Sequence, residues 1–165
     1  MKKAVFLDRD GVINYERGKY NLTPDDFVVN DGVGEAIALL KQKGYMVIVI
    51  SNQGALAKKL TSFENIEAMH LKLADYLKTY KTSVDEIYYC PHHQDITKCL
   101  CRKPLPLMIE KAMSRFNIDK SKSFMIGDAY RDVEAAELAG IKAYKIDPNS
   151  NLLYVCNSIL RVQND

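Results

Sequence analysis

The stretch Asp8-Arg9-Asp10-Gly11-Val12-Ile13-Asn14 decides how the rest of the chain is interpreted. It directly follows the apolar run Ala4-Val5-Phe6-Leu7, which predicts a short buried strand. The two carboxylates therefore follow the carboxyl end of a strand, the edge at which open α/β sheets bind ligands. Such a pair suits a hard cation with oxygen ligands, and one member suits a nucleophilic role. The alternative is a plain Asp/Gly turn, and the remaining sequence decides between the two.

Apolar runs and amphipathic helical patterns alternate downstream of this stretch. Further strands are predicted at 46–50, 86–89, 123–126 and 142–146. Helices are predicted over 33–43 with Gly44 as the stop, from a capping-box pattern at Thr61-Ser62-Phe63-Glu64, over 105–116, and over 130–139 with Gly140 as the stop. The segment 152–162 is expected to add one element of either kind. The alternation predicts an α/β fold, a Rossmann-like doubly wound parallel sheet with helices on both faces.

Length and composition favour one domain spanning residues 1–165. The chain has 165 residues, 47% of them hydrophobic, which is enough for a single core. No repeat or linker is visible, and the segments 15–31 and 55–62 are expected to be loops, so no cap domain should cover the site.

The charge pattern and the N-terminus bear on partners and location. A net charge of +2 without a basic block argues against nucleic acid as a partner. No apolar run approaches the roughly 18 residues of a membrane span, and the four apolar residues before Asp8 are too few for a signal peptide. We therefore expect a cytoplasmic protein that has no membrane partner and acts as a monomer.

Chemistry-bearing residues follow several predicted strands. They are Asp8 and Asp10 after the first, Ser51 after the second, Lys103 after the third and its loop, and Asp128 after the fourth. A parallel sheet brings these ends to one edge. Singly, each has a structural explanation, since Ser51-Asn52 or Asp128 could cap a helix and Lys103 could be a solvated loop residue. Together they favour one functional crevice.

The set in this crevice suits phosphoryl transfer. Mg²⁺ takes one or two carboxylates, which Asp8 and Asp128 would supply, besides a substrate phosphate. Ser51 and Lys103 would stabilise the charge on the phosphoryl oxygens. A carboxylate nucleophile would attack phosphorus, and Asp10 is placed to protonate the leaving alkoxide and later take a proton from water.

The loop 90–103 carries a second pattern, Cys90-Pro91-His92 followed by Cys99-Leu100-Cys101. Three thiolates and one imidazole make a closed tetrahedral zinc site of the structural kind. His93 is an alternative ligand to His92, and a set of unpaired thiols is the alternative to a metal site. We expect Cys156 to be a small apolar residue of the tail.

Four motifs resemble those of the haloacid dehalogenase superfamily of phosphatases. They are Asp8-x-Asp10-Gly11-Val12, Ser51-Asn52-Gln53, Lys103-Pro104 and Gly127-Asp128-x-x-x-Asp132, which together span residues 4–147. The resemblance implies that Asp8 is the nucleophile and Asp10 the general acid/base. It implies that Ser51 and Lys103 bind phosphate, and that Asp8, Asp128 and the backbone carbonyl of Asp10 hold Mg²⁺. Asp132 would orient Lys103 or the metal waters.

The loop narrows the resemblance to a zinc-containing branch that includes heptose-bisphosphate and histidinol phosphatases. The family pattern favours His92 over His93, so Cys90, His92, Cys99 and Cys101 are the expected zinc ligands. A phosphorylated sugar, most like D-glycero-D-manno-heptose 1,7-bisphosphate, is the expected substrate, with Asn52 and Arg102 as further substrate-binding residues. Arg102 would take a second anionic group. The alternatives are histidinol phosphate as substrate, a non-catalytic phosphosugar-binding protein, and a zinc interaction module.

Overall fold

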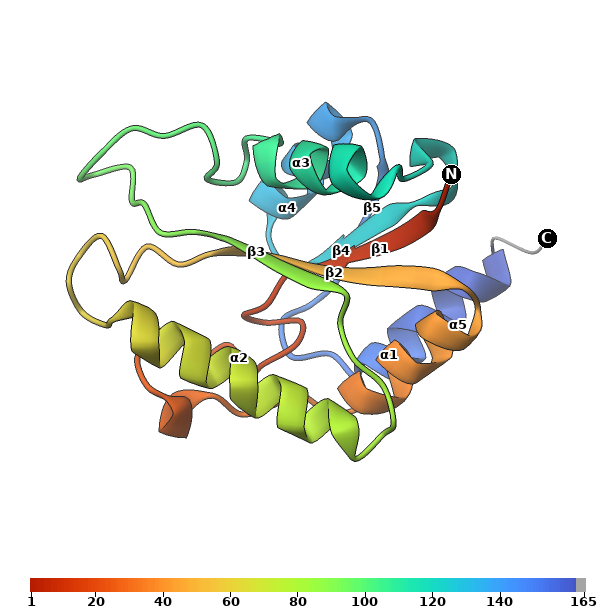
Figure 1. Cartoon of the computed structure of the whole chain (residues 1–165), viewed down its shortest axis with the longest axis horizontal. Coiled ribbons are helices and arrows are strands. Elements are labelled where there is room, and N and C mark those ends of the chain that lie inside the picture. Colours follow the sequence, from red (N-terminus) through yellow and green to blue (C-terminus); the bar gives the residue numbers. More distant parts are fainter. Residues whose placement is uncertain (163–165) are drawn as a thin grey trace.

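Parallel strands form the central sheet of the computed structural model, which describes residues 1–162 (Figure 1). The strands are β1 (Lys3–Leu7), β2 (Tyr45–Asn52), β3 (Glu86–Cys90), β4 (Phe124–Gly127) and β5 (Lys142–Lys145). Their order in the sheet is β3-β2-β1-β4-β5, and each neighbouring pair is parallel. The predicted doubly wound α/β fold is thereby confirmed, with each strand within two residues of its expected position.

The central strand β1 owes its continuous apolar sequence to burial on both faces. Residues Ala4 to Leu7 have no exposed surface. Successive side chains of a strand point to opposite faces, so Val5 and Leu7 pack in one core cluster and Ala4 and Phe6 in the other. Strands that are covered on both sides read as apolar runs rather than as an alternation.

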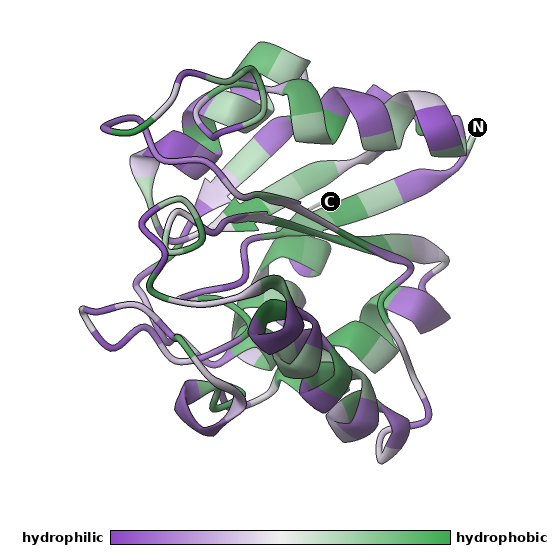
Figure 2. Ribbon diagram, turned by 60° about the vertical axis from the view of Figure 1, so that its left-hand side comes forward, coloured by the Kyte–Doolittle hydropathy of each residue, from purple (hydrophilic) through white to green (hydrophobic). Residues whose placement is uncertain are grey.

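Helices cover the two faces unequally. One face is covered by α1 (Val33–Gln42), α2 (Phe63–Lys78) and α5 (Leu152–Val162), and the other by α3 (Leu107–Phe116) and α4 (Tyr130–Ala139) (Figure 1). The hydrophobic side of each helix faces the sheet and the hydrophilic side faces outward, as Figure 2 shows for α2 and α3. The segment of undecided kind, 152–162, is the helix α5.

Two helix starts differ from the prediction. The N-cap of α2 is Ser62, whose Oγ accepts a hydrogen bond of 3.2 Å from the backbone N–H of Asn65, whereas Thr61 donates its hydroxyl to the carbonyl of Leu22. Thr61 therefore ties the loop 55–62 to the loop 15–31 instead of capping the helix. The helix α3 begins at Leu107, two residues later than expected, and Leu105 lies outside it with 40% of its surface exposed.

The long loop after β1 contains one short 3-10 turn, Pro24–Asp26, where only loop was expected. No helix among the described residues is long and apolar enough to cross a membrane. The single domain over 1–165 stays a prediction, and residues 163–165 of that range lie outside the part of the chain that the structure describes.

The strand order fixes where a ligand binds. The chain passes from β1 outward to β2 and β3, and then crosses to the other side of β1 to form β4 and β5. The direction of winding therefore changes between β1 and β4. In open α/β sheets, the crevice beyond the carboxyl ends of the strands at such a switch point is the ligand site.

Candidate active site

An ion-pair cluster lies at the carboxyl ends of β1 and β4. The Nζ atom of Lys103 lies 2.7 Å from Asp8 Oδ1 and 2.7 Å from Asp132 Oδ1, and it donates a hydrogen bond of 2.8 Å to the carbonyl of Ile50. The side chains of Lys103 and Asp132 are at most 1% exposed, and that of Asp8 is 5% exposed. The ammonium thus donates to Asp8 and to the carbonyl of Ile50 and forms an ion pair with Asp132, so Lys103 is fixed in place before any substrate arrives.

Burial dominates the electrostatics of this cluster. It raises the pKa of Asp8 to about 8, because Lys103 offsets the loss of solvation only in part and the charge of Asp132 adds to the shift. Burial alone would lower the pKa of Lys103, but the two carboxylates beside it outweigh that effect and raise it. Lys103 is therefore protonated at neutral pH, whereas Asp8 needs further positive charge nearby to ionise fully.

The carboxylates of Asp8, Asp128 and Asp132 could supply that charge by holding a cation. Each offers an oxygen within 4.8 Å of the others. The Oδ1 atom of Asp128 is buried and has no hydrogen-bond partner among the described residues, and burial raises the pKa of this residue too. Gly11 leaves the space for Asp128, since a Cβ at Gly11 would overlap its carboxylate. Asp132 Oδ1, which is ion-paired with Lys103, likewise lacks a hydrogen-bond partner among the described residues, and crowded carboxylate oxygens of this kind fit Mg²⁺, which prefers oxygen ligands.

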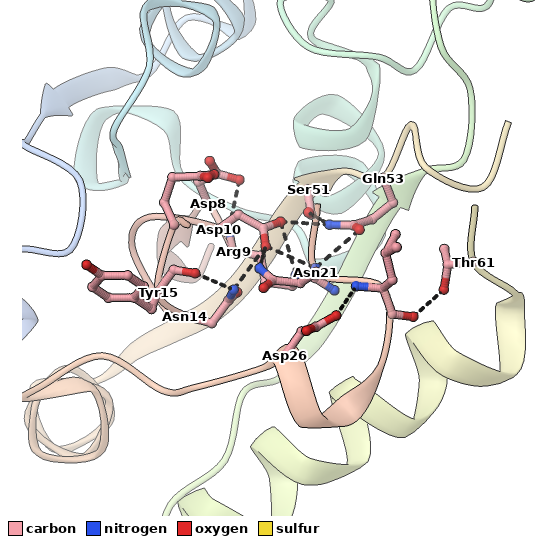
Figure 3. A network of polar contacts seen from close by, with 12 residues as sticks. Asp8, Arg9, Asp10, Asn14, Tyr15, Asn21, Asp26, Ser51, Gln53 and Thr61 are labelled. Atoms are coloured by element: carbon pink, nitrogen blue, oxygen red, sulfur yellow. Dashed lines mark hydrogen bonds and ion pairs between the residues drawn. The ribbon is translucent and has the colours of Figure 1, made fainter. Parts of the chain in front are cut away.

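A cage of hydrogen-bond donors surrounds the carboxylate of Asp10 (Figure 3). Arg9 reaches both oxygens, with its Nε 3.3 Å from Oδ2 and its Nη2 3.1 Å from Oδ1. The side-chain amides of Asn14, Asn21 and Gln53 donate at 3.0, 2.8 and 2.9 Å. The side chain of Asp10 keeps 23% of its surface exposed. The cage therefore holds the carboxylate in one orientation and leaves it open to the crevice.

The cage also sets the charge of Asp10. Burial would raise its pKa, but the guanidinium of Arg9 and the hydrogen bonds from Arg9, Asn14 and Asn21 hold the pKa well below the usual range. Asp8 and Asp10 are two residues apart, yet their surroundings move their pKa values in opposite directions. This division is typical of acid pairs with different catalytic roles.

The end of β2 supplies a hydroxyl and an amide. The Oγ atom of Ser51 is buried and accepts a hydrogen bond of 2.7 Å from the Gln53 amide. Both ends of the Asn52 amide bond to the backbone of Lys103, each at 3.0 Å. Asn52 lines the crevice, but this bonding favours a role in positioning Lys103 over the substrate-binding role expected from the sequence.

The crevice beside these groups has a volume of about 610 Å³. Its lining contains Asp10, Glu16, Gly18, Lys19, Tyr20, Asn21, Asn52, Gln53, Gly54, His93, Gln94, Arg102 and Arg131. The expected substrate residue Arg102 lies in this wall, where it donates to the carbonyl of His92 at 2.9 Å and to Gln94 at 3.0 Å. The absence of a side chain at Gly54 allows the ring of His93 to pack against the backbone there, because a Cβ at Gly54 would lie 2.8 Å from that ring.

The structure also gathers the four expected zinc ligands. Cys90 Sγ lies 3.5 Å from His92 Nδ1, 3.7 Å from Cys99 Sγ and 3.1 Å from Cys101 Sγ, and Cys101 Sγ lies 3.4 Å from His92 Nδ1. Tetrahedral zinc with metal–ligand bonds of about 2.0–2.3 Å separates its ligand atoms by roughly 3.5–3.8 Å, which these distances approach. The thiols form no disulfide. His93 does not join them, since its Nδ1 accepts the backbone N–H of Asp95.

Sequence reasoning did not single out Arg9, Asn14, Asn21 and Gln53, which build the cage around Asp10. Arg9 and Asn14 lie inside the stretch that decides the fold, and Gln53 lies in the second motif. Closeness in sequence to the predicted site residues could therefore have identified these three. Nothing in the sequence distinguishes Asn21, because it reaches Asp10 through the path of the loop 15–31.

The chain is similar in sequence and in structure to known hydrolases. The family model described as haloacid dehalogenase-like hydrolase matches residues 2–140. The chain is 44% identical to the D-glycero-beta-D-manno-heptose-1,7-bisphosphate 7-phosphatase of Photorhabdus laumondii over 84% of this chain and 76% of the relative. It is 35% identical to the enzyme of that name from Rhodopseudomonas palustris, over 98% and 93%. A crystal structure of D,D-heptose 1,7-bisphosphate phosphatase from B. bronchiseptica, complexed with magnesium and phosphate, matches with a TM-score of 0.90 and 30% identity over 97% of this chain and 99% of that chain.

Proposed function

Since the chain belongs to the haloacid dehalogenase-like hydrolases, we propose that it removes the 7-phosphate of D-glycero-D-manno-heptose 1,7-bisphosphate and leaves the heptose monophosphate. The chain is a phosphomonoester hydrolase. The observation that carries the proposal is the pair at the end of β1: a buried Asp8 held by Lys103 and a caged Asp10 beside a crevice.

In the first step, Asp8 attacks phosphorus and forms an aspartyl phosphate while the sugar alkoxide leaves. The backbone N–H of Arg9 donates to Asp8 Oδ1 at 2.8 Å, and Lys103 donates to the same oxygen, so the carboxylate is oriented before attack. The Oγ of Ser51 accepts from Gln53 and has its own proton to donate to a phosphoryl oxygen.

Asp10 moves the proton in both steps. Its low pKa makes it a carboxylate in the free enzyme, which suits the second step, in which it takes a proton from the water that attacks the aspartyl phosphate. To protonate the leaving alkoxide first, Asp10 must gain a proton. The negative charge of an incoming phosphate opposes the effect of Arg9 and favours that uptake.

Asp8 and Asp128, with the backbone carbonyl of Asp10, would hold Mg²⁺, and Asp132 would orient Lys103. Magnesium, when bound, would supply positive charge that favours ionised Asp8 and neutralises the phosphoryl oxygens. Cys90, His92, Cys99 and Cys101 would hold a structural zinc ion that fixes the loop 90–103 as a wall of the crevice.

The charge of the crevice favours a bisphosphate over histidinol phosphate. Three cations, Lys19, Arg102 and Arg131, line it against the carboxylates of Asp10 and Glu16. A second phosphate finds complementary charge there, whereas the ammonium group of histidinol phosphate does not. Retention of both Asp8 and Asp10 weighs against a non-catalytic binding protein.

We further propose that the protein works in the cytoplasm as a single-domain monomer in heptose metabolism for lipopolysaccharide. The test of function is a substrate panel in Mg²⁺ with both anomers of the heptose bisphosphate and histidinol phosphate, followed by phosphate release. The bisphosphate should have the highest kcat/KM, and the signal should disappear when Mg²⁺ is chelated. A higher kcat/KM for histidinol phosphate would refute the proposed substrate.

A further inference from the structure

Two cations of the crevice wall form no direct hydrogen bond or ion pair within the part of the chain that the structure describes. Lys19 and Arg131 are exposed, and within residues 1–162 neither has a hydrogen bond, an ion pair or a ring contact. Arg102, in contrast, donates to His92 and Gln94 of its own loop. The cations of the crevice without a direct contact are therefore Lys19 and Arg131, although Arg131 lies near enough to Asp128 to favour the ionised form of that carboxyl.

The two side chains come from segments far apart in the sequence. Lys19 lies in the long loop after β1, and Arg131 lies in the first turn of α4, next to the buried Asp132. Both line the same crevice as Asp10. Of the two carboxylates in the lining, Asp10 is paired with Arg9, and Glu16 accepts the backbone N–H of Gly18 and forms no ion pair within residues 1–162. Unpaired cations in a concave polar site raise the local concentration of anionic ligands.

We propose that Lys19 and Arg131 bind the anionic group of the substrate that is not transferred. The inference rests on the proposed function, because the substrate must carry a second phosphate. The fork of Arg131 suits two phosphate oxygens at once, and the ammonium of Lys19 adds a mobile point charge. Lys19 and Arg131 thereby favour small phosphate esters in which the leaving alcohol carries a second phosphate group.

The test compares two substrates in each variant. We would measure kcat/KM for the heptose 1,7-bisphosphate and for p-nitrophenyl phosphate, which has no second anion, in the wild type, Lys19→Gln, Arg131→Gln and the double variant. The matched controls are Lys120→Gln and Arg161→Gln, which remove exposed cations outside the crevice. The dissociation constant of heptose 1-phosphate, by calorimetry, provides a readout without turnover.

The ratio of the two kcat/KM values should fall about five- to tenfold in each single variant, as expected for losing one charge-assisted hydrogen bond, and further in the double variant. Binding of heptose 1-phosphate should weaken in parallel, and the controls should keep the wild-type ratio. A wild type that prefers the bisphosphate but keeps its ratio in the variants would overturn the inference alone. A wild type without that preference would overturn the proposed function and this inference with it.

Discussion

The hydrogen bonds between Asn52 and Lys103 make a sharp prediction for Asn52→Ala. The substitution removes two bonds of 3.0 Å to the backbone of Lys103, one to its N–H and one to its carbonyl. Lys103 would then be held in position only by its neighbours along the chain and by the contacts of its buried ammonium group.

The size of the effect follows from these bonds. Two partly buried neutral hydrogen bonds contribute about 0.5–1.5 kcal/mol each, so we expect a loss of about 2 kcal/mol. In a chain of this length, that corresponds to a fall in Tm of roughly 4–8 °C. A displacement of Lys103 on the order of 1 Å should lower kcat up to about a hundredfold, with a smaller change in KM.

The assay combines urea unfolding with steady-state kinetics on the bisphosphate. Asn52→Asp is the informative partner, because it keeps an acceptor for the Lys103 N–H but places negative charge against the Lys103 carbonyl. Asn157→Ala, on α5 and away from the crevice, should change stability by less than about 0.5 kcal/mol. The reasoning would be refuted if Asn52→Ala raised KM severalfold while Tm and kcat stayed at wild-type values, since Asn52 would then contact the substrate.

Four further predictions address the nucleophile, a buried histidine, a glycine and the zinc loop. Asp8→Asn should abolish phosphate release, because an amide does not attack phosphorus; turnover near the wild-type rate in a phosphate assay would contradict the mechanism. His70 is buried with its Nε2 unpartnered among the described residues, and burial lowers its pKa to about 4. The unfolded chain therefore binds this proton more tightly, so the contribution of His70 to stability is complete above about pH 6.5 and falls by about 2 kcal/mol by pH 5. Urea unfolding at both pH values should show that loss in the wild type and not in His70→Gln. Gly11→Ala should cost about 2–3 kcal/mol and weaken Mg²⁺ binding by calorimetry, because Gly11 has a φ of +91° and a Cβ would displace Asp128; unchanged affinity would contradict the magnesium site. Removing zinc with a chelator, or Cys101→Ser, should lower Tm while the circular dichroism of the sheet and helices persists, and metal analysis that finds no zinc in carefully prepared protein would refute the assignment.

Much of the fold could be predicted because its signals are local. The apolar run before Asp8 and the glycines after α1 and α4 mark ends of elements, and the structure has both glycines at positive φ. The start of α2 was misplaced by one residue, because Thr61 and Ser62 are equally good caps in sequence and only the distant Leu22 carbonyl distinguishes them.

The site was predictable as a set of residues but not as a set of contacts. Strand ends of a parallel sheet meet, so Asp8, Lys103 and Asp128 could be placed together before the structure. The hydrogen bonds from Asn52 to the Lys103 carbonyl and from Asn21 to Asp10 depend on the paths of loops. No periodic pattern in the sequence encodes those paths. The pKa values of the two acids likewise depend on burial and on neighbours brought together by folding.

Gly11 and Gly127 have a consequence for protein engineering. A Cβ at Gly11 would overlap the carboxylate of Asp128, and one at Gly127 would overlap the side chain of Asp132. Asp128 and Asp132 thus each occupy the volume that a side chain at the facing glycine would fill. If only the four acids were transferred into another parallel α/β scaffold, side chains at the positions of Gly11 and Gly127 would clash with Asp128 and Asp132. The active site must therefore be transferred as the four acids together with the two glycines that face Asp128 and Asp132.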